Sequence, residues 1–200
     1  MTTFFRQSDP SWSHCRLGHG PSTIGRAGCL LTALCQARVW LHDDDKTARI
    51  VEPVDANLRC LDAGAFVGSG LVVAKAAQAL GLVADPSLRR SITSGDDALR
   101  NAIRDAFERG DVVLLHVDHD STLAHGDPEG DHWILALRLE LVDHHDTPGV
   151  VSITPELVCA DPATGREARI SLRTLHDIGG TWKPYRVTDV QPVSRLAQKG

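Results

Sequence analysis

The strongest apolar pattern in the first half of the chain runs from Gly28 to about Leu41. Leucine, alanine and valine fall on most sides of a helix drawn through it, which predicts a largely buried helix over residues 28–41. The preceding residues 1–24 are rich in Ser, Pro, Gly and His and show no such periodicity, so we expect an irregular lead-in. Three side chains are expected to anchor it: Gln7, Asp9 and Trp12.

Two further helices are predicted downstream. Residues 71–80 are apolar and alanine-rich, and Gly81 follows as a C-terminal stop. The next helix is expected to begin at Ser94, because Asp97 three residues later resembles the second half of a capping box. Gly110 marks its end.

The second half of the chain contains runs typical of β-strands. Residues 112–117 are apolar with turn signals on both sides, and residues 132–142 are β-rich and alternate in part. Residues 158–160 form a third run, and residues 182–187 are expected to close the sheet. Helices followed by a meander of strands predict the α+β class with an antiparallel sheet. Without internal repeats or linkers, residues 1–200 are expected to form a single domain.

Composition and charge restrict the function classes. The apolar fraction of 42% and the charged fraction of 24% are those of an ordinary globular protein, and no run is long enough to span a bilayer. The net charge of -5 offers no electrostatic attraction for nucleic acid or an anionic membrane. Residues 1–7 lack an apolar signal core, so we expect synthesis in the cytoplasm, with delivery elsewhere by lysis or within a larger particle.

The cysteines argue against a zinc ribbon, because no CxxC pair exists among them. Their number is odd, which predicts at least one free thiol, and a reducing compartment is the simplest setting. We expect Cys35, Cys60 and Cys159 to be small buried apolar residues and Cys15 to be an exposed thiol. The fifth, Cys29, is different because it lies where a glycine-punctuated loop meets the first helix.

Cys29 therefore becomes the candidate nucleophile. The first turn of a helix has free N–H groups and the positive end of the helix dipole, and both favour thiolate over thiol. His132, at the start of a predicted strand, is the candidate general base. Asp161, at the end of another, is the candidate partner that orients the imidazole. A cysteine followed much later by histidine and then Asp or Asn is the order found in papain-like peptidases.

Four stretches in this order resemble the papain-like cysteine peptidases of the bacteriocin-processing-endopeptidase type, in their broad bacterial and phage branch. The resemblance spans roughly residues 5–187. The stretches are Gln7-Ser8-Asp9-Pro10-Ser11-Trp12, Thr23-Ile24-Gly25-Arg26-Ala27-Gly28-Cys29, Asp131-His132-Trp133 and Asp161-Pro162-Ala163-Thr164-Gly165.

The resemblance implies a papain-like fold, in which an N-terminal helical half carrying the nucleophile packs on an antiparallel sheet. It implies cysteine-dependent hydrolysis of peptide or amide bonds without a cofactor. Members with this Thr-Ile-Gly-x-x-Gly-Cys form are similar to phage lysins and tail-associated proteins, so the expected substrate is a peptide of the bacterial cell wall. Processing of a protein precursor is the alternative substrate, and other virion proteins are the expected partners.

One position departs from the family pattern. In the transporter-linked members, a glutamine a few residues before the cysteine supplies a donor to the oxyanion, whereas position 23 here is threonine. We expect Gln7 to be brought back to the site as the substitute, with the N–H of Cys29 as the second donor.

Two other functions remain open. Thr23 in place of glutamine suggests a structural or docking module of a phage tail, with its chemistry weak or lost. Residues 116–132 are rich in His and Asp, which are zinc ligands, and suggest a metal-dependent hydrolase. Their spacing matches no metal motif, so a polar loop between two strands is the favoured interpretation, and the same holds for His144 and His145.

Overall fold

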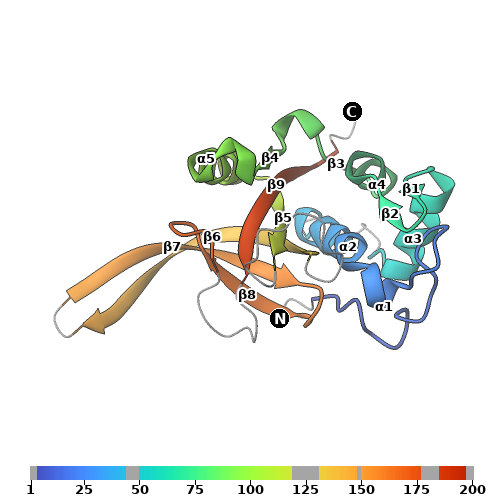
Figure 1. Cartoon of the computed structure of the whole chain (residues 1–200), viewed down its shortest axis with the longest axis horizontal. Coiled ribbons are helices and arrows are strands. Elements are labelled where there is room, and N and C mark those ends of the chain that lie inside the picture. Colours follow the sequence, from blue (N-terminus) through green and yellow to red (C-terminus); the bar gives the residue numbers. More distant parts are fainter. Residues whose placement is uncertain (1–3, 44–49, 119–130, 148–149, 177–184, 197–200) are drawn as a thin grey trace.

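The computed structural model describes residues 4–43, 50–118, 131–147, 150–176 and 185–196. Helices lie on both faces of a seven-stranded antiparallel sheet (Figure 1). The helices are α1 (Ile24–Ala27), α2 (Cys29–Leu41), α3 (Pro53–Asp62), α4 (Val73–Ala79) and α5 (Asp96–Glu108), with short 3-10 turns η1 (Pro86–Leu88) and η2 (Ile92–Ser94). The α+β class and the antiparallel sheet are thus confirmed.

The sheet has the strand order β3-β9-β5-β6-β7-β8, and β4 pairs separately with β9. A two-stranded sheet, β1 (Phe66–Val67) with β2 (Gly70–Leu71), lies apart from it. The strands of the large sheet are β3 (Leu82–Val83), β4 (Arg90–Ser91), β5 (Val112–Asp118), β6 (Asp131–Thr147), β7 (Val150–Asp161), β8 (Arg166–Ser171) and β9 (Arg186–Arg195). Strands β5 to β8 follow one another as a meander, but β9 returns to the middle of the sheet beside β5.

The closing strand is longer than expected. It runs to Arg195, whereas the predicted strand covered residues 182–187, of which 182–184 lie outside the described residues. Pairing of β9 with β5, β4 and β3 explains the extension, because each short strand adds hydrogen bonds to a different part of β9.

The predicted capping of α5 is wrong. Ser94 is the last residue of η2, and Gly95, at φ +86°, occupies the cap position without any side-chain hydrogen bond. The capping box of Ser94 and Asp97 is therefore absent from this helix. Asp96 and Asp97 instead place two carboxylates in the first turn, where the helix dipole favours negative charge.

The sheet separates two hydrophobic cores. Alternate side chains of β5 face opposite sides, so Val112 and Leu114 pack on the side of α2, whereas Val113 and Leu115 pack on the side of α5. A central strand buried on both faces reads as a continuous apolar run, which is how residues 112–117 appeared in the sequence. Figure 1 shows α2, α3 and α4 together on one side and α5 on the other.

Residues 5–12, the N-terminal strap, cross from α2 to the end of β7. The N–H of Phe5 donates to Gln36 Oε1 of α2 at 3.1 Å, and the N–H of Gln7 donates to the carbonyl of Pro162 at 2.8 Å. Trp12 is buried, and its indole N–H donates to the carbonyl of Arg6 at 2.9 Å. The irregular lead-in is thus confirmed, and it joins the helices to the sheet.

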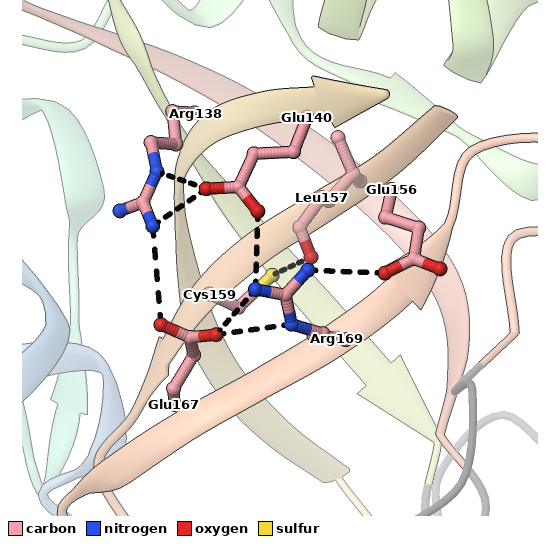
Figure 2. A network of polar contacts seen from close by, with 7 residues as sticks. All are labelled: Arg138, Glu140, Glu156, Leu157, Cys159, Glu167 and Arg169. Carbon is pink, nitrogen blue, oxygen red and sulfur yellow. Dashed lines mark hydrogen bonds and ion pairs between the residues drawn. The ribbon is translucent and has the colours of Figure 1, made fainter. Parts of the chain in front are cut away.

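Charged side chains of β6, β7 and β8 form a network on the outer part of the sheet (Figure 2). Arg169 is its centre: the guanidinium binds Glu156 at 3.1 Å, Glu140 at 3.0 Å and Glu167 at 2.9 Å. Arg138 binds the second oxygen of Glu140 at 2.8 Å. Glu156 is only 2% exposed, so a guanidinium close by compensates for the loss of water around its carboxylate.

No helix among the described residues is long and apolar enough to cross a membrane.

We expect Arg169→Met to lower the free energy of unfolding by about 1–3 kcal/mol, because it removes a charged donor from the buried Glu156 carboxylate. Urea unfolding followed by circular dichroism measures the change. Arg166→Met is the matched control on the same strand, since Arg166 is exposed and should shift stability by less than about 0.5 kcal/mol. Equal effects of the two substitutions would contradict this role for Arg169.

Candidate active site

Cys29 is the first residue of α2, as the sequence predicted. The chain makes one helical turn in α1, passes through Gly28 and starts a second helix whose backbone ladder begins with the N–H of Thr32 bonded to the carbonyl of Gly28 at 2.9 Å. The N–H groups of Cys29 and Leu30 come before that ladder, so neither donates to a carbonyl within the helix. The thiol therefore lies at the positive end of a 13-residue helix, and Cys29 as a whole residue is half-buried.

The glycines before Cys29 allow the chain to pack closely against itself. A Cβ on Gly25 would lie 2.8 Å from the Cβ of Ser13, and a Cβ on Gly28 would collide with the carbonyl of Ile24. Their smallness thus lets Ser13, directly after residues 5–12, and α1 pack close to Cys29. The space beside these two glycines is therefore filled by Ser13 and Ile24 of the same chain.

His132 lies at the start of β6 and Asp161 at the end of β7, and the two meet. The Nε2 atom of His132 is 2.8 Å from Oδ1 of Asp161, and both side chains are buried, at 4% and 1% exposure. Because Asp161 occupies Nε2, the other ring nitrogen, Nδ1, is left for the hydrogen bond that His132 shares with Cys29. The structure thus brings together the three residues Cys29, His132 and Asp161.

Every lone-pair direction of Asp161 is in use. Oδ1 accepts from the N–H of Ala163 at 2.8 Å as well as from His132, and Oδ2 accepts from the hydroxyls of Thr164 at 3.0 Å and Tyr185 at 3.1 Å. These donors prevent the carboxylate from rotating. The Ala163 bond is also the turn expected of an aspartate before proline, so Asp161 forms a turn and orients His132.

Sequence reasoning missed Tyr185 and Thr164 as parts of this site. Thr164 carried a usable signal, since a hydroxyl three residues after an aspartate in a turn often bonds back to it. Tyr185 carried none: it is the chain's single tyrosine, it precedes β9, and it reaches Asp161 only because β9 returns to the middle of the sheet.

The surroundings of Cys29 favour its thiolate. Burial opposes ionisation, but the hydrogen bond and the positive charge of His132 outweigh it, with help from the N–H groups of Trp133 and Leu30, and hold the pKa of Cys29 below its ordinary value. The Leu30 N–H is one of the groups left free at the start of α2.

The imidazole is correspondingly held in its protonated form. Burial acts to lower the pKa of His132, but hydrogen bonds to Asp161 and Cys29, and the negative charges of both, raise it to about 9. Burial would raise the pKa of Asp161, yet its bonds to His132, Ala163 and Thr164 keep it below the ordinary value. All three shifts favour a thiolate–imidazolium pair beside an ionised carboxylate.

Gln7 lies between the two halves of the site. Its backbone N–H binds Pro162, next to Asp161, and its side-chain Nε2 donates to the carbonyl of Gly25 at 3.2 Å, in the loop before Cys29. An amide NH2 has two hydrogens, and Gly25 takes one of them. Thr23 immediately precedes α1 and makes no side-chain cap. The return of Gln7 to the nucleophile loop is thus observed.

The remaining cysteines follow the predictions with one exception. Cys35, Cys60 and Cys159 are buried, and burial raises the pKa of Cys60 to about 11, as expected of inert core thiols. Cys15 is half-buried against the α2-side core, so the prediction of an exposed thiol is wrong.

The His/Asp-rich segment is described only at its ends. Residues 119–130 lie outside the described residues, as do the side chains of His144 and His145. Among the side chains that the structure describes, no group of three or more His, Cys, Asp or Glu residues is arranged to hold a metal ion. The two histidines at the ends of this segment belong to different sites: His116 binds Thr188, whereas His132 binds Asp161.

Comparison with models of known protein families finds no match to this chain, and comparison with curated protein sequences finds none either.

The electrostatics of the site predict how Cys29 reacts with iodoacetamide. The pKa of Cys29 is held below its ordinary value, so the thiolate fraction at neutral pH exceeds that of a free cysteine, and His132 keeps its proton up to about pH 9. Alkylation of wild type should therefore be fast at neutral pH. His132→Ala should move the rate profile to higher pH, with about a tenfold loss at pH 7 for each unit of pKa increase.

Peptide mapping by mass spectrometry measures the rate at each cysteine. His176→Ala, which changes an exposed histidine after β8, is the control and should leave the profile unchanged. A profile at Cys29 that is identical in wild type and His132→Ala would show that the imidazole does not ionise this thiol.

Proposed function

We propose that the protein is a papain-like cysteine peptidase that hydrolyses peptide or amide bonds through an acyl-enzyme. The observation that carries the proposal is the position of His132, bound through Nε2 to the buried Asp161 and hydrogen-bonded to the helix-terminal Cys29. A nucleophile, a base and a group that orients the base are the parts that thiol hydrolysis requires.

The acylation step starts from the thiolate. Cys29 Sγ attacks the carbonyl carbon of the scissile bond, and the electron pair of the C=O bond moves to oxygen. The tetrahedral intermediate collapses, the C–N bond breaks, and the His132 imidazolium gives its proton to the departing nitrogen. The products are a free amine, a thioester on Cys29 and a neutral imidazole, which Asp161 keeps in one orientation.

The deacylation step reverses these roles. His132 takes a proton from water as the hydroxyl oxygen attacks the thioester carbon, and breakage of the C–S bond releases the carboxylic acid and restores the thiolate. In both steps the oxyanion is stabilised by the N–H of Cys29 and the second hydrogen of the Gln7 amide. The bond from Gln7 to Gly25 supports this role, because it places the amide in the loop that precedes the nucleophile.

The substrate is proposed from the sequence resemblance. Peptidases with the same Thr-Ile-Gly-x-x-Gly-Cys form belong with phage lysins and tail-associated proteins, so we propose peptides of bacterial peptidoglycan as the substrate. A phage or prophage origin, with the domain acting as part of a virion or after lysis, accompanies this proposal. No cofactor takes part in the proposed steps.

Digestion of purified peptidoglycan and of casein tests this function, with new amino groups measured as product. Wild type should release them, iodoacetamide should abolish the activity, and a chelator should leave it intact. Cys29→Ala should lower the rate to background, because the nucleophile is lost.

Three results would contradict the proposal. Hydrolysis by Cys29→Ala would exclude the thiol mechanism. Loss of activity with the chelator alone would favour a metal-dependent hydrolase. Absence of hydrolysis on both substrates, together with no selective alkylation of Cys29, would favour a structural module.

Gln7→Ala tests the proposed oxyanion donor separately from the proposed nucleophile. Loss of one oxyanion donor should lower kcat/KM by about a hundred- to a thousandfold, while alkylation of Cys29 at neutral pH continues. Gln78→Ala, at an exposed position of α4, should change neither measurement. A decrease of only a few fold in Gln7→Ala would assign the donor to another group.

A further inference from the structure

A row of side chains crosses the sheet beside the proposed nucleophile. Trp133 on β6 pairs in register with His116 on β5, which pairs with Asp189 on β9. These residues share the α2 face of the sheet, since Trp133 packs against the α2-side core and His116 continues the alternation of Val112 and Leu114. Arg89, just before β4, extends the row, because β4 pairs with β9 at Asp189.

The row begins at the nucleophile. Trp133 directly follows His132, and its backbone N–H is one of the groups that stabilise the Cys29 thiolate. The ring of Trp133 lies 4.8 Å from the ring of His116 and 5.9 Å from the guanidinium carbon of Arg89. Trp133 thus contacts Cys29 through its backbone N–H and a cationic group through its ring.

Arg89 is held in place and still exposed. Its Nε and Nη2 atoms donate to the same oxygen of Asp189, at 3.3 and 3.2 Å, while 48% of its side chain remains accessible. Cation–π contact with Trp133 supports the guanidinium from a second side. An arginine that is immobilised by its neighbours loses less entropy when it binds a ligand.

The second oxygen of Asp189 faces another basic group. It lies 3.6 Å from Nδ1 of His116, and that nitrogen is 3.0 Å from the hydroxyl oxygen of Thr188. Because the Thr188 hydroxyl donates to the carbonyl of His116 at 3.2 Å, its oxygen accepts from Nδ1, which therefore carries a hydrogen. One carboxylate is thus shared between a guanidinium and an imidazole.

We propose that Arg89, with Trp133 beneath it, forms a substrate subsite that binds an acidic side chain next to the scissile bond. This inference rests on the proposed function, because it assigns a ligand to the surface beside Cys29. The guanidinium edge away from Asp189 matches the two oxygens of a carboxylate. In a chain of net charge -5, a fixed cation beside the nucleophile gives local attraction to an acidic group that the molecule as a whole repels.

Two alkylating reagents that differ by one charge test the subsite without knowledge of the natural substrate. N-iodoacetyl-glutamate α-amide and N-iodoacetyl-glutamine α-amide have nearly equal size, and only the first carries a carboxylate. Rates at Cys29 are measured by peptide mapping and divided by the rates toward N-acetylcysteine. Wild type should prefer the acidic reagent by roughly five- to tenfold, and this preference should weaken at high salt.

Arg89→Gln should bring the preference to about one while leaving the rate with iodoacetamide unchanged. Arg90→Gln is the matched control: its guanidinium binds the carbonyls of Ser87 and Arg89, so the preference should remain at the wild-type value. Both arginines are exposed, so neither substitution should prevent folding.

Equal rates for the two reagents in wild type would overturn the subsite, and so would a preference that survives Arg89→Gln. In either case rapid alkylation by iodoacetamide would leave the proposed function standing. If no reagent alkylated Cys29 selectively, the proposed function and the subsite would both be overturned.

Discussion

A buried carboxylate is stable only when hydrogen-bond donors and a positive charge surround it, and Asp161 sets that condition for the whole site. Its four partners come from three places: His132 on β6, Ala163 and Thr164 in its own turn, and Tyr185 before β9. The return of β9 therefore completes the hydrogen bonding of Asp161 as well as the sheet. The bond from Asp161 to His132 favours the protonated imidazole, and the protonated imidazole in turn lowers the pKa of Cys29.

The N-terminal strap connects this buried group to the nucleophile. Gln7 binds the chain on both sides of the site, at Pro162 through its backbone and at Gly25 through its side chain. Glycine at positions 25 and 28 permits the close packing that this connection needs, because a Cβ at either position would collide with the chain. A segment without regular secondary structure thus bridges the loop before Cys29 and the turn after β7.

The α2 face of the sheet has two polar regions with different roles. Near the nucleophile, Trp133, His116, Asp189 and Arg89 leave a guanidinium accessible to a ligand. In the outer network of Figure 2, Arg169 binds three carboxylates, one of them buried, and its charge is used within the fold. An arginine bound to one carboxylate and half exposed has donors to offer a substrate, whereas Arg169 is committed to its neighbours.

The order of the amino acids was enough to predict the α+β class, the buried helix that starts at Cys29 and the three residues that meet at its end, because helical periodicity, apolar strand runs and the order of cysteine, histidine and aspartate are local or linear signals. It failed at the capping of α5, where a glycine of positive φ replaces the expected serine. Three features became visible only in the folded chain: β9 returns beside β5, Tyr185 completes the shell of Asp161, and Arg89 lies against Trp133. These contacts join residues far apart in the chain, and strand order, which brings them together, leaves no periodic trace in a single sequence.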